Sequence, residues 1–293
     1  MLIYSIVLAS IVLSESLCEW VGLSQSEHLL STTIMDYWHL HQEMGFVGAL
    51  GDLIASIIFC RKNLIKLRFD ILKIIRFPRR ISEIPKDIKL FCVMVGPCFA
   101  FSIFKQIFFP TWSLSYLSIY WWIVPSTIAS IIVPLILIKC DKLPADKTEI
   151  TEKEAKTIGL IQLLSFLPGI GSFDTIIGAM RFLGYTCLQA FRCYILVSIP
   201  FGILTCINCI PLIVQDILWQ GEINLSLCAA VLIISSACEY LILRLVELFW
   251  SKVSLTTWSI FCMITGILGM SYKACFVFKH EEVVRLLSPF FGC

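Results

Sequence analysis

The sequence predicts an all-α, polytopic integral membrane protein with six transmembrane helices and two re-entrant helical hairpins, arranged as two inverted repeats. Three observations lead there: the composition, the order of the apolar segments, and the placement of Lys and Arg. The chain has 293 residues, of which 58% are hydrophobic and 15% charged, and its mean hydropathy is +0.87. So few charges cannot cover a water-soluble protein of this size, which excludes an ordinary soluble domain.

Eight apolar segments are long enough to enter a bilayer. They are Leu2–Leu23, Phe46–Cys60, Ile88–Phe109, Tyr116–Ile138, Thr157–Leu183, Phe191–Val214, Ile223–Leu243 and Leu255–Phe278. A helix that crosses the hydrocarbon core needs about 20 residues. We therefore expect the second helix to begin before Phe46.

Two of these segments are interrupted by residues that do not suit a continuous membrane helix. The first carries Glu15 and Glu19, and the fifth carries Pro168, Gly169 and Gly171. Proline and paired glycines break a helix, and broken backbone at membrane depth is tolerated only where it is buried in protein or lines a wet cavity. The two breaks are therefore expected to share one interior pocket.

The loops differ in charge, which predicts orientation. Residues 61–89 carry ten basic and three acidic side chains, and residues 139–156 carry five lysines. By the positive-inside rule both loops are cytoplasmic, as is the short loop between Arg244 and Lys252. The loops at 110–115 and 215–222 lack basic residues and are assigned to the outside.

These assignments require one segment to turn back. An odd number of crossings must separate the inner loop near residue 150 from the outer loop near residue 218, yet two apolar segments lie between them. The broken segment Thr157–Leu183 is the natural one to re-enter. The same order in the N-terminal half gives one membrane domain over 1–293, with repeat one at about 1–140 and repeat two at about 155–280, although Leu2–Leu23 is long enough to span alone.

The spacing of the acidic pair in the first segment suggests a metal-binding role. Glu15 and Glu19 are four residues apart, so on a helix both carboxylates project from one face. Such a pair suits a hard divalent cation, Mg or Ca, that in turn holds phosphate oxygens. The alternative is a hydrated helix end. His28 is either a general base or an interfacial residue.

The order of these features, taken with several later ones, resembles the undecaprenyl-diphosphate phosphatase (bacitracin-resistance) family. The matching features are the apolar run, Glu15-x-x-x-Glu19, Ser24-x-Ser26-x-His28, the stretch Gly159-Leu160-Ile161-Gln162 leading into Leu167-Pro168-Gly169-Ile170, Ile199-Pro200, and Trp250-Ser251-Lys252-Val253. The resemblance covers most of the chain.

The resemblance implies a hydrolase that removes the terminal phosphate of undecaprenyl diphosphate, which recycles the carrier lipid for cell-wall synthesis. It implies a multi-pass protein of the bacterial inner membrane with its active site facing the periplasm. The expected partners are a polyprenyl diphosphate and the bilayer, with no nucleic acid, and the oligomeric state is left open. By match, the catalytic residues are Glu15, Glu19, Ser24, Ser26 and His28, with Glu15 and Glu19 also the metal ligands.

The second half of the implied pocket departs from the family pattern Pro-Gly-x-Ser-Arg-Ser-Gly. Here the stretch Pro168–Asp174 reads Pro-Gly-Ile-Gly-Ser-Phe-Asp, which implies Gly169, Gly171 and Ser172 as substrate-binding residues. Ser172 stands where the family has a phosphate-binding arginine, and serine lacks the charged, forked donor set of arginine. Asp174 is expected to be the N-cap of the following helix.

The first motif also departs from the family pattern, and two other arginines could replace the missing one. In the first motif Gly22, Gln25 and Glu27 replace the family's proline, serine and glycine. Arg181 and Arg192 are either substitutes for the missing arginine or charges at the inner boundary. The sequence therefore favours a polyprenyl-diphosphate phosphatase. The alternative is a catalytically impaired homologue that binds or translocates a polyprenyl phosphate.

Overall fold

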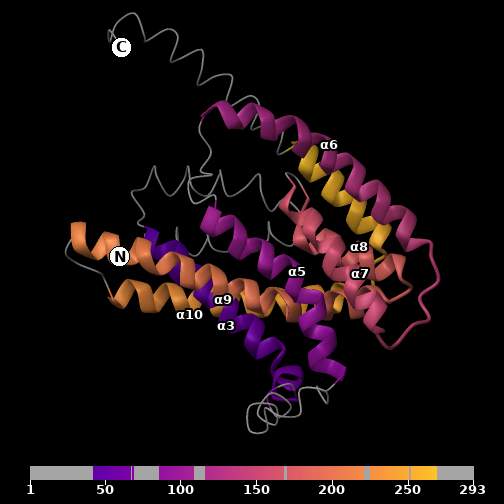
Figure 1. Ribbon diagram of the computed structural model, residues 1–293, viewed down its shortest axis with the longest axis horizontal. Helices are drawn as coiled ribbons and strands as arrows, with labels where there is room; N and C mark the ends of the chain where they lie inside the picture. The colour runs from indigo at the N-terminus through magenta and orange to yellow at the C-terminus, as the bar shows by residue number, and fades with distance from the viewer. Residues whose placement is uncertain are drawn as a thin grey trace, which may run out of the picture.

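The computed structural model describes residues 42–66, 68, 86–108, 116–167, 170–220, 225–250 and 252–268. Within these ranges every regular element is a helix (Figure 1). The prediction of an all-α chain is therefore confirmed for the part of the chain that the structure describes.

The helices follow the predicted apolar segments closely. They are α3 (Gln42–Phe59), α5 (Lys86–Phe108), α6 (Tyr116–Asp141), α7 (Glu152–Gln162), the 3₁₀ turn η2 (Leu163–Phe166), α8 (Ser172–Phe182), α9 (Cys187–Gln220), α10 (Leu225–Trp250) and a last helix, Leu255–Leu268. Among the described residues, three stretches are long and apolar enough to cross a membrane, namely Lys86–Phe104, Cys187–Asn208 and Cys228–Trp250.

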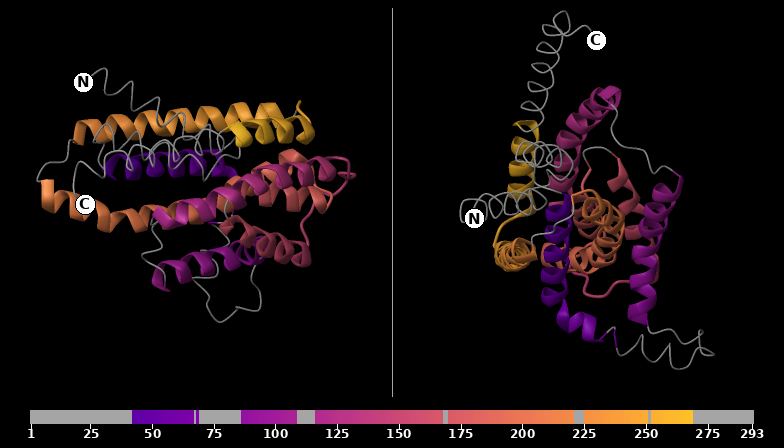
Figure 2. Two further views of the ribbon diagram at one scale, coloured as in Figure 1. Left: turned by 90° about the horizontal axis from the view of Figure 1, so that it is seen from above. Right: turned by 90° about the vertical axis from the view of Figure 1, so that its left-hand side faces the viewer.

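Helix α3 packs against both α9 and α10, and the three lie side by side (Figures 1 and 2). The approach to α10 is very close at Gly51, where an added Cβ would lie 1.9 Å from Ser235 Oγ. Farther along both helices, the Phe59 ring lies 5.0 Å from the Arg244 guanidinium. Because residue numbers increase in the same direction along both contacts, α3 and α10 run parallel. The predicted topology has both helices running from the outer to the inner side, and the observed course agrees with it.

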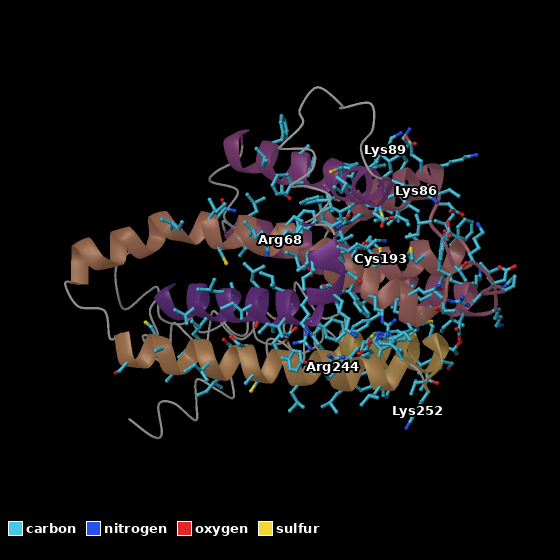
Figure 3. The ribbon with its side chains drawn as sticks, turned by 90° about the horizontal axis from the view of Figure 1, so that it is seen from below. Arg68, Lys86, Lys89, Cys193, Arg244 and Lys252 are labelled. Carbon is cyan, nitrogen blue, oxygen red and sulfur yellow. The ribbon has the colours of Figure 1, made fainter. Side chains whose placement is uncertain are left out.

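Several loops gather at one end of the molecule, which we call the basic end. It comprises the start of α5, the connection 142–151, the start of α9 and the end of α10. Ion pairs join the first two, with Nζ to carboxylate distances of 3.1 Å for Lys86–Glu149 and 2.8 Å for Lys89–Glu152. Figure 3 shows Lys86, Lys89 and Lys252 toward this end.

The last helix also begins at the basic end. Asp141, the final residue of α6, accepts hydrogen bonds from the backbone N–H and the hydroxyl of Thr256, at 3.0 and 2.8 Å. The described parts of the loops predicted to be cytoplasmic therefore share one end of the fold.

Helices α7 and α8 form a hairpin that starts and finishes at the basic end. The backbone N–H of Lys147, before α7, donates to the carbonyl of Gly184, after α8, at 3.1 Å. Each helix has 11 residues, a length of about 16 Å, which is roughly half of a hydrocarbon core of about 30 Å. The segment thus turns back on itself, as the count of crossings predicts, although its first helix begins at Glu152 and not at Thr157.

Candidate functional site

The hairpin is anchored at the basic end by one buried arginine. Arg181, near the end of α8, is 4% exposed. Its guanidinium donates to the carbonyl oxygens of Tyr185, Asp141 and Leu143 at 2.7, 2.9 and 2.9 Å, and to that of Cys140 at 3.3 Å. The last carbonyls of a helix have no partner within the helix, so Arg181 serves as a side-chain cap for the end of α6.

A second buried charge holds the start of α7. Thr151 and Glu154 form a reciprocal capping box, in which each side chain bonds the backbone N–H of the other residue. The Glu154 carboxylate also pairs with Lys147 and lies 2.8 Å from the Tyr185 hydroxyl. Burial alone would raise the pKa of Glu154, but the hydrogen bonds from Lys147, Thr151 and Tyr185 outweigh it and lower the pKa to about 2. The basic end of the hairpin is therefore held by many hydrogen bonds, although Arg181 Nε is buried without a partner among the described residues.

The opposite end of the hairpin contains the break in the second predicted motif. Gly171 is the N-cap of α8 and its cap has no side-chain hydrogen bond. The expectation that Asp174 is the N-cap residue is wrong in position, because Gly171 is the N-cap and Asp174 is the third residue of α8. Its carboxylate nevertheless accepts a hydrogen bond from the backbone N–H of Gly171. The first N–H groups of a helix have no intrahelical acceptor, so the break presents backbone donors.

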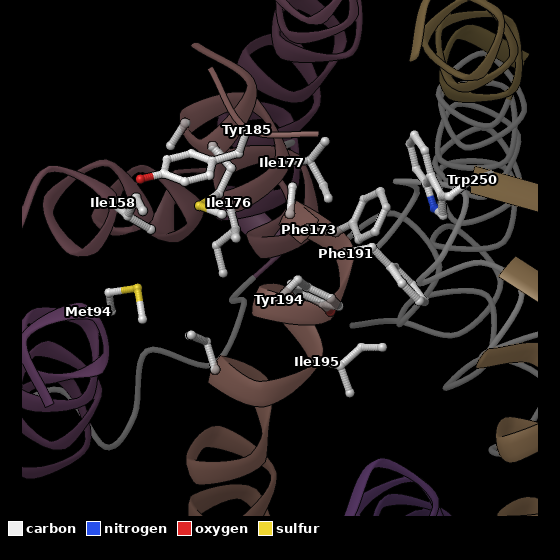
Figure 4. Packing of buried hydrophobic residues seen from close by; sticks show 14 of the residues in the cluster. Met94, Ile158, Phe173, Ile176, Ile177, Tyr185, Phe191, Tyr194, Ile195 and Trp250 are labelled. Carbon is white, nitrogen blue, oxygen red and sulfur yellow. The ribbon is translucent and has the colours of Figure 1, made fainter. Parts of the chain in front are cut away.

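Phe173 fills the position next to the break with a large ring. Its centroid lies 5.1 Å from that of Tyr194 on α9, 6.0 Å from Trp250 on α10 and 6.1 Å from Trp258 on the last helix. Figure 4 shows Phe173 between Tyr194 and Trp250. This aromatic packing holds the N-terminal turn of α8 against three other helices.

Gln162 ends α7, and the 3₁₀ turn η2 separates it from the break. It is 3% exposed, and its Oε1 has no hydrogen-bond partner among the residues that the structure describes. Ala155, Ile158 and Gly159 are buried on the same helix, so Gln162 extends the interior-facing side of α7. A buried amide oxygen without a hydrogen bond costs roughly 1–3 kcal/mol. The Gln162 oxygen could therefore accept a hydrogen bond from a donor on a bound ligand.

The structure describes only some of the predicted site residues. Gly171 and Ser172 lie at the break, with Gly171 buried and Ser172 half-buried. The remaining predicted residues lie outside the described part of the chain: Glu15, Glu19, Ser24, Ser26, His28 and Gly169. Among the described residues no group of three His, Cys, Asp or Glu side chains could hold a metal ion, so the Glu15 and Glu19 metal site stays a prediction.

Both arginines that were considered as substitutes for the arginine missing at Ser172 form hydrogen bonds with other groups. Arg181 lies nine residues farther along α8, about 14 Å away along the axis, and its donors serve the carbonyls at the basic end. Arg192 on α9 pairs with Glu247 on α10 at 2.8 Å. The interpretation of both as boundary charges therefore fits the structure better than rescue of the missing arginine.

Sequence reasoning gave no role to the groups that surround the break. Gln162 and Trp250 appeared only as parts of resembling stretches, and Trp258 only as a residue of the last apolar segment. Both indole Nε1 atoms are buried without a hydrogen-bond partner among the described residues. For Gln162, the only sequence signal was a single glutamine a few residues before a Pro-Gly break. The aromatic contacts left no local signal, because they join segments that are far apart in the chain.

Comparisons with known proteins agree with this arrangement. Residues 6–268 match the family model described as bacitracin resistance protein BacA. A protein of Campylobacter curvus (strain 525.92) named undecaprenyl-diphosphatase is 30% identical over 143 residues, which are 48% of this chain and 53% of that protein. The aligned region thus spans about half the length of that relative.

The family model takes in both interrupted segments and all the helices described above, including the turned-back hairpin with its Pro-Gly break. The chain therefore belongs to the bacitracin resistance protein BacA family.

Proposed function

We propose that this protein is a membrane phosphatase that hydrolyses undecaprenyl diphosphate to undecaprenyl phosphate. Family membership supports this proposal, and so does the name of the Campylobacter relative, undecaprenyl-diphosphatase. The observation that carries it is the α7–α8 hairpin, which turns back after about half a bilayer thickness and presents the second motif at its tip.

In the proposed topology six helices cross the membrane and two hairpins re-enter it, in two inverted repeats. The basic end lies at the cytoplasmic surface of the bacterial inner membrane, since Lys and Arg favour that side. The tip of the hairpin then lies near the midplane, reached from the periplasm. The parallel course of α3 and α10 and the shared end of the basic loops support this topology.

In the proposed site, Glu15 and Glu19 hold a divalent cation, Mg or Ca, which when bound neutralises the diphosphate charge. His28 handles a proton, and Ser24 or Ser26 contacts or attacks the terminal phosphorus. The hairpin contributes the Gly169, Gly171 and Ser172 segment. Its backbone N–H groups at the start of α8 favour an anion, because a helix N-terminus carries partial positive charge.

A purified, reconstituted protein assayed for phosphate release from a polyprenyl diphosphate tests the proposal. We expect release that is abolished by chelation and reduced at least a hundredfold in Glu15→Gln and Glu19→Gln, on the scale of a lost metal-ligand interaction. Lys153→Gln, an exposed change at the basic end, is the matched control and should release phosphate like the unaltered protein. Absence of release with every divalent metal would exclude the enzyme.

One observation favours a second candidate function. Ser172 replaces the family arginine, and the structure commits Arg181 and Arg192 to other partners. A protein that binds or translocates a polyprenyl phosphate without hydrolysis would not need that arginine. Transfer of a labelled polyprenyl phosphate across vesicles without phosphate release would establish this function, and Ser172→Arg would then leave transfer unimproved.

A further inference from the structure

Two arginines share one glutamate where α9 and α10 meet near the basic end. Arg192 Nε and Nη2 donate to Glu247 Oε1 at 3.0 and 2.8 Å. Arg244 Nη1 donates to Glu247 Oε2 at 3.0 Å. We call these three residues the arginine cluster. Two guanidinium charges against one carboxylate leave one positive charge unbalanced.

The position of Arg244 is fixed by two aromatic rings. Its guanidinium carbon lies 5.0 Å from the Phe59 ring centroid and 5.3 Å from that of Tyr240. Its Nε and Nη2 also donate to the Tyr240 hydroxyl at 3.1 and 3.0 Å. Stacking and hydrogen bonding together hold the planar fork in place, and a fixed arginine fork suits bidentate binding of a phosphate.

The cluster lies on a surface that faces the bilayer. On α10, Leu241, Leu245 and Leu248 surround Arg244 and are 59%, 55% and 62% exposed. The arginine side chains themselves are 55% exposed for Arg192 and 46% for Arg244, whereas Glu247 is only 17% exposed. The positive groups are thus the accessible part of the cluster, and the negative group lies beneath them.

The cluster lies close to the ends of α9 and α10 that belong to the basic end. Arg244 lies six residues before the end of α10 and Arg192 five residues after the start of α9. At about 1.5 Å per residue both lie roughly 8–9 Å from the ends of their helices. Both belong to stretches apolar enough to cross the membrane, where an uncompensated charge is costly.

We propose that the arginine cluster binds the phosphodiester headgroup of an anionic phospholipid in the membrane leaflet next to the basic end. The lipid phosphate supplies the negative charge that Glu247 leaves unbalanced, and its acyl chains cover the exposed leucines of α10. Basic pockets between membrane helices bind anionic headgroups in this way. The proposal depends on the chain being embedded in a bilayer and not on phosphatase activity.

The test uses native mass spectrometry of the purified full-length protein with phosphatidylglycerol or phosphatidylcholine at equal concentrations. We expect the unaltered protein to bind phosphatidylglycerol more tightly. Arg192→Gln should weaken that binding about fivefold, the scale of one basic residue near a membrane surface, and leave phosphatidylcholine unaffected. Lys153→Gln removes an exposed positive charge from α7, outside the cluster, and should change neither affinity.

Glu247→Gln separates lipid binding from a purely structural role. It removes the only acid in the cluster, so affinity for phosphatidylglycerol should rise, again about fivefold. A fall in affinity like that of Arg192→Gln would overturn the proposal, as would equal binding of the two lipids by the unaltered protein. Displacement of the lipid by equimolar inorganic phosphate would also overturn it, because the site would then take any free phosphate.

Discussion

The two ends of the α7–α8 hairpin are built on opposite principles. At the basic end, Arg181 serves four carbonyl oxygens, and Glu154 is bonded by Lys147, Thr151 and Tyr185. At the tip, Gln162 has a buried amide oxygen without a partner among the described residues. The N-cap of α8 is Gly171, which has no side chain to cap the helix, and the Asp174 carboxylate accepts from the Gly171 N–H.

The difference indicates which end is structural and which is functional. Buried polar groups in folded proteins are nearly always bonded, so each exception calls for an explanation. An anchor gains from complete bonding, whereas a binding site must keep donors and acceptors available for its ligand. The hairpin is thus anchored through its base at the basic end, whereas its tip carries a buried amide oxygen that has no partner among the described residues.

Removal of Arg181 should give the largest effect on the anchor. Arg181→Met keeps an unbranched apolar stem but removes the guanidinium, which leaves four carbonyl oxygens at the ends of α6 and α8 without their donor. We expect the free energy of unfolding in detergent to fall by about 3 kcal/mol, within the range for breaking a buried charged network. Thermal and denaturant unfolding of the purified protein measure it.

Arg181→Lys is the control for charge. It keeps the positive charge near the end of α6 but cannot serve carbonyls that lie in several directions. Stability should fall by less than in Arg181→Met. Equal stability of Arg181→Met and the unaltered protein would show that the anchor is not needed.

Acid should weaken the same anchor through Glu154. The pKa of this carboxyl is lowered from its ordinary value of 4.5 to about 2 in the folded protein, because the hydrogen bonds from Lys147, Thr151 and Tyr185 outweigh the effect of burial. A group whose pKa is depressed by folding stabilises the fold above its unfolded pKa, and that stabilisation disappears as the pH falls through the folded pKa. Stability should therefore decline by about 2 kcal/mol between pH 4.5 and pH 2.

Glu154→Gln supplies the comparison for this pH effect. Unfolding midpoints measured between pH 7 and pH 2 should start lower in the variant and decline less over the acidic range. Identical pH profiles for the variant and the unaltered protein would assign the acid sensitivity to other groups.

The packing of α7 on α5 can be tested between the two ends of the hairpin. An added Cβ at Gly159 would lie 2.7 Å from the Met94 carbonyl oxygen and 2.8 Å from that of Val93. Because backbone atoms cannot rotate away, Gly159→Ala should cost about 1–2 kcal/mol of stability. Gly48→Ala on α3 is the matched control, since its Cβ would meet nothing within 4 Å, and it should be neutral or stabilising by up to about 1 kcal/mol.

Apolar length and charge placement predicted the helices and the turning back of the fifth segment, because membrane insertion depends on just these properties. Helix ends were less predictable. Glu152 starts α7 through a capping box with Thr151, in a polar stretch that hydropathy assigns to a loop.

Side-chain roles were harder to predict than segments. A buried Arg181 that caps another helix depends on Asp141 and Leu143, about 40 residues earlier, and no local pattern reveals such a pairing. Asp174 does accept from a free backbone N–H, as expected, but from the third helical position, because Gly171 is the N-cap residue. The predicted residues Glu15, Glu19, Ser24, Ser26 and His28 lie outside the described part of the chain.

The smallest effect on stability, and the sharpest test of the tip, is expected for Gln162. Gln162→Leu has a similar volume and removes a buried amide whose oxygen has no partner among the described residues, so the fold should be as stable as before or slightly more so. If the amide binds the substrate, phosphate release should fall about tenfold, which corresponds to a loss of roughly 1.4 kcal/mol of binding in the transition state.

The measurement pairs unfolding midpoints with phosphate release from a polyprenyl diphosphate. Unchanged release with raised stability would make Gln162 an imperfect core residue, and a loss of both would make it part of the anchor. Only a loss of activity at retained stability separates the tip of the hairpin from its base.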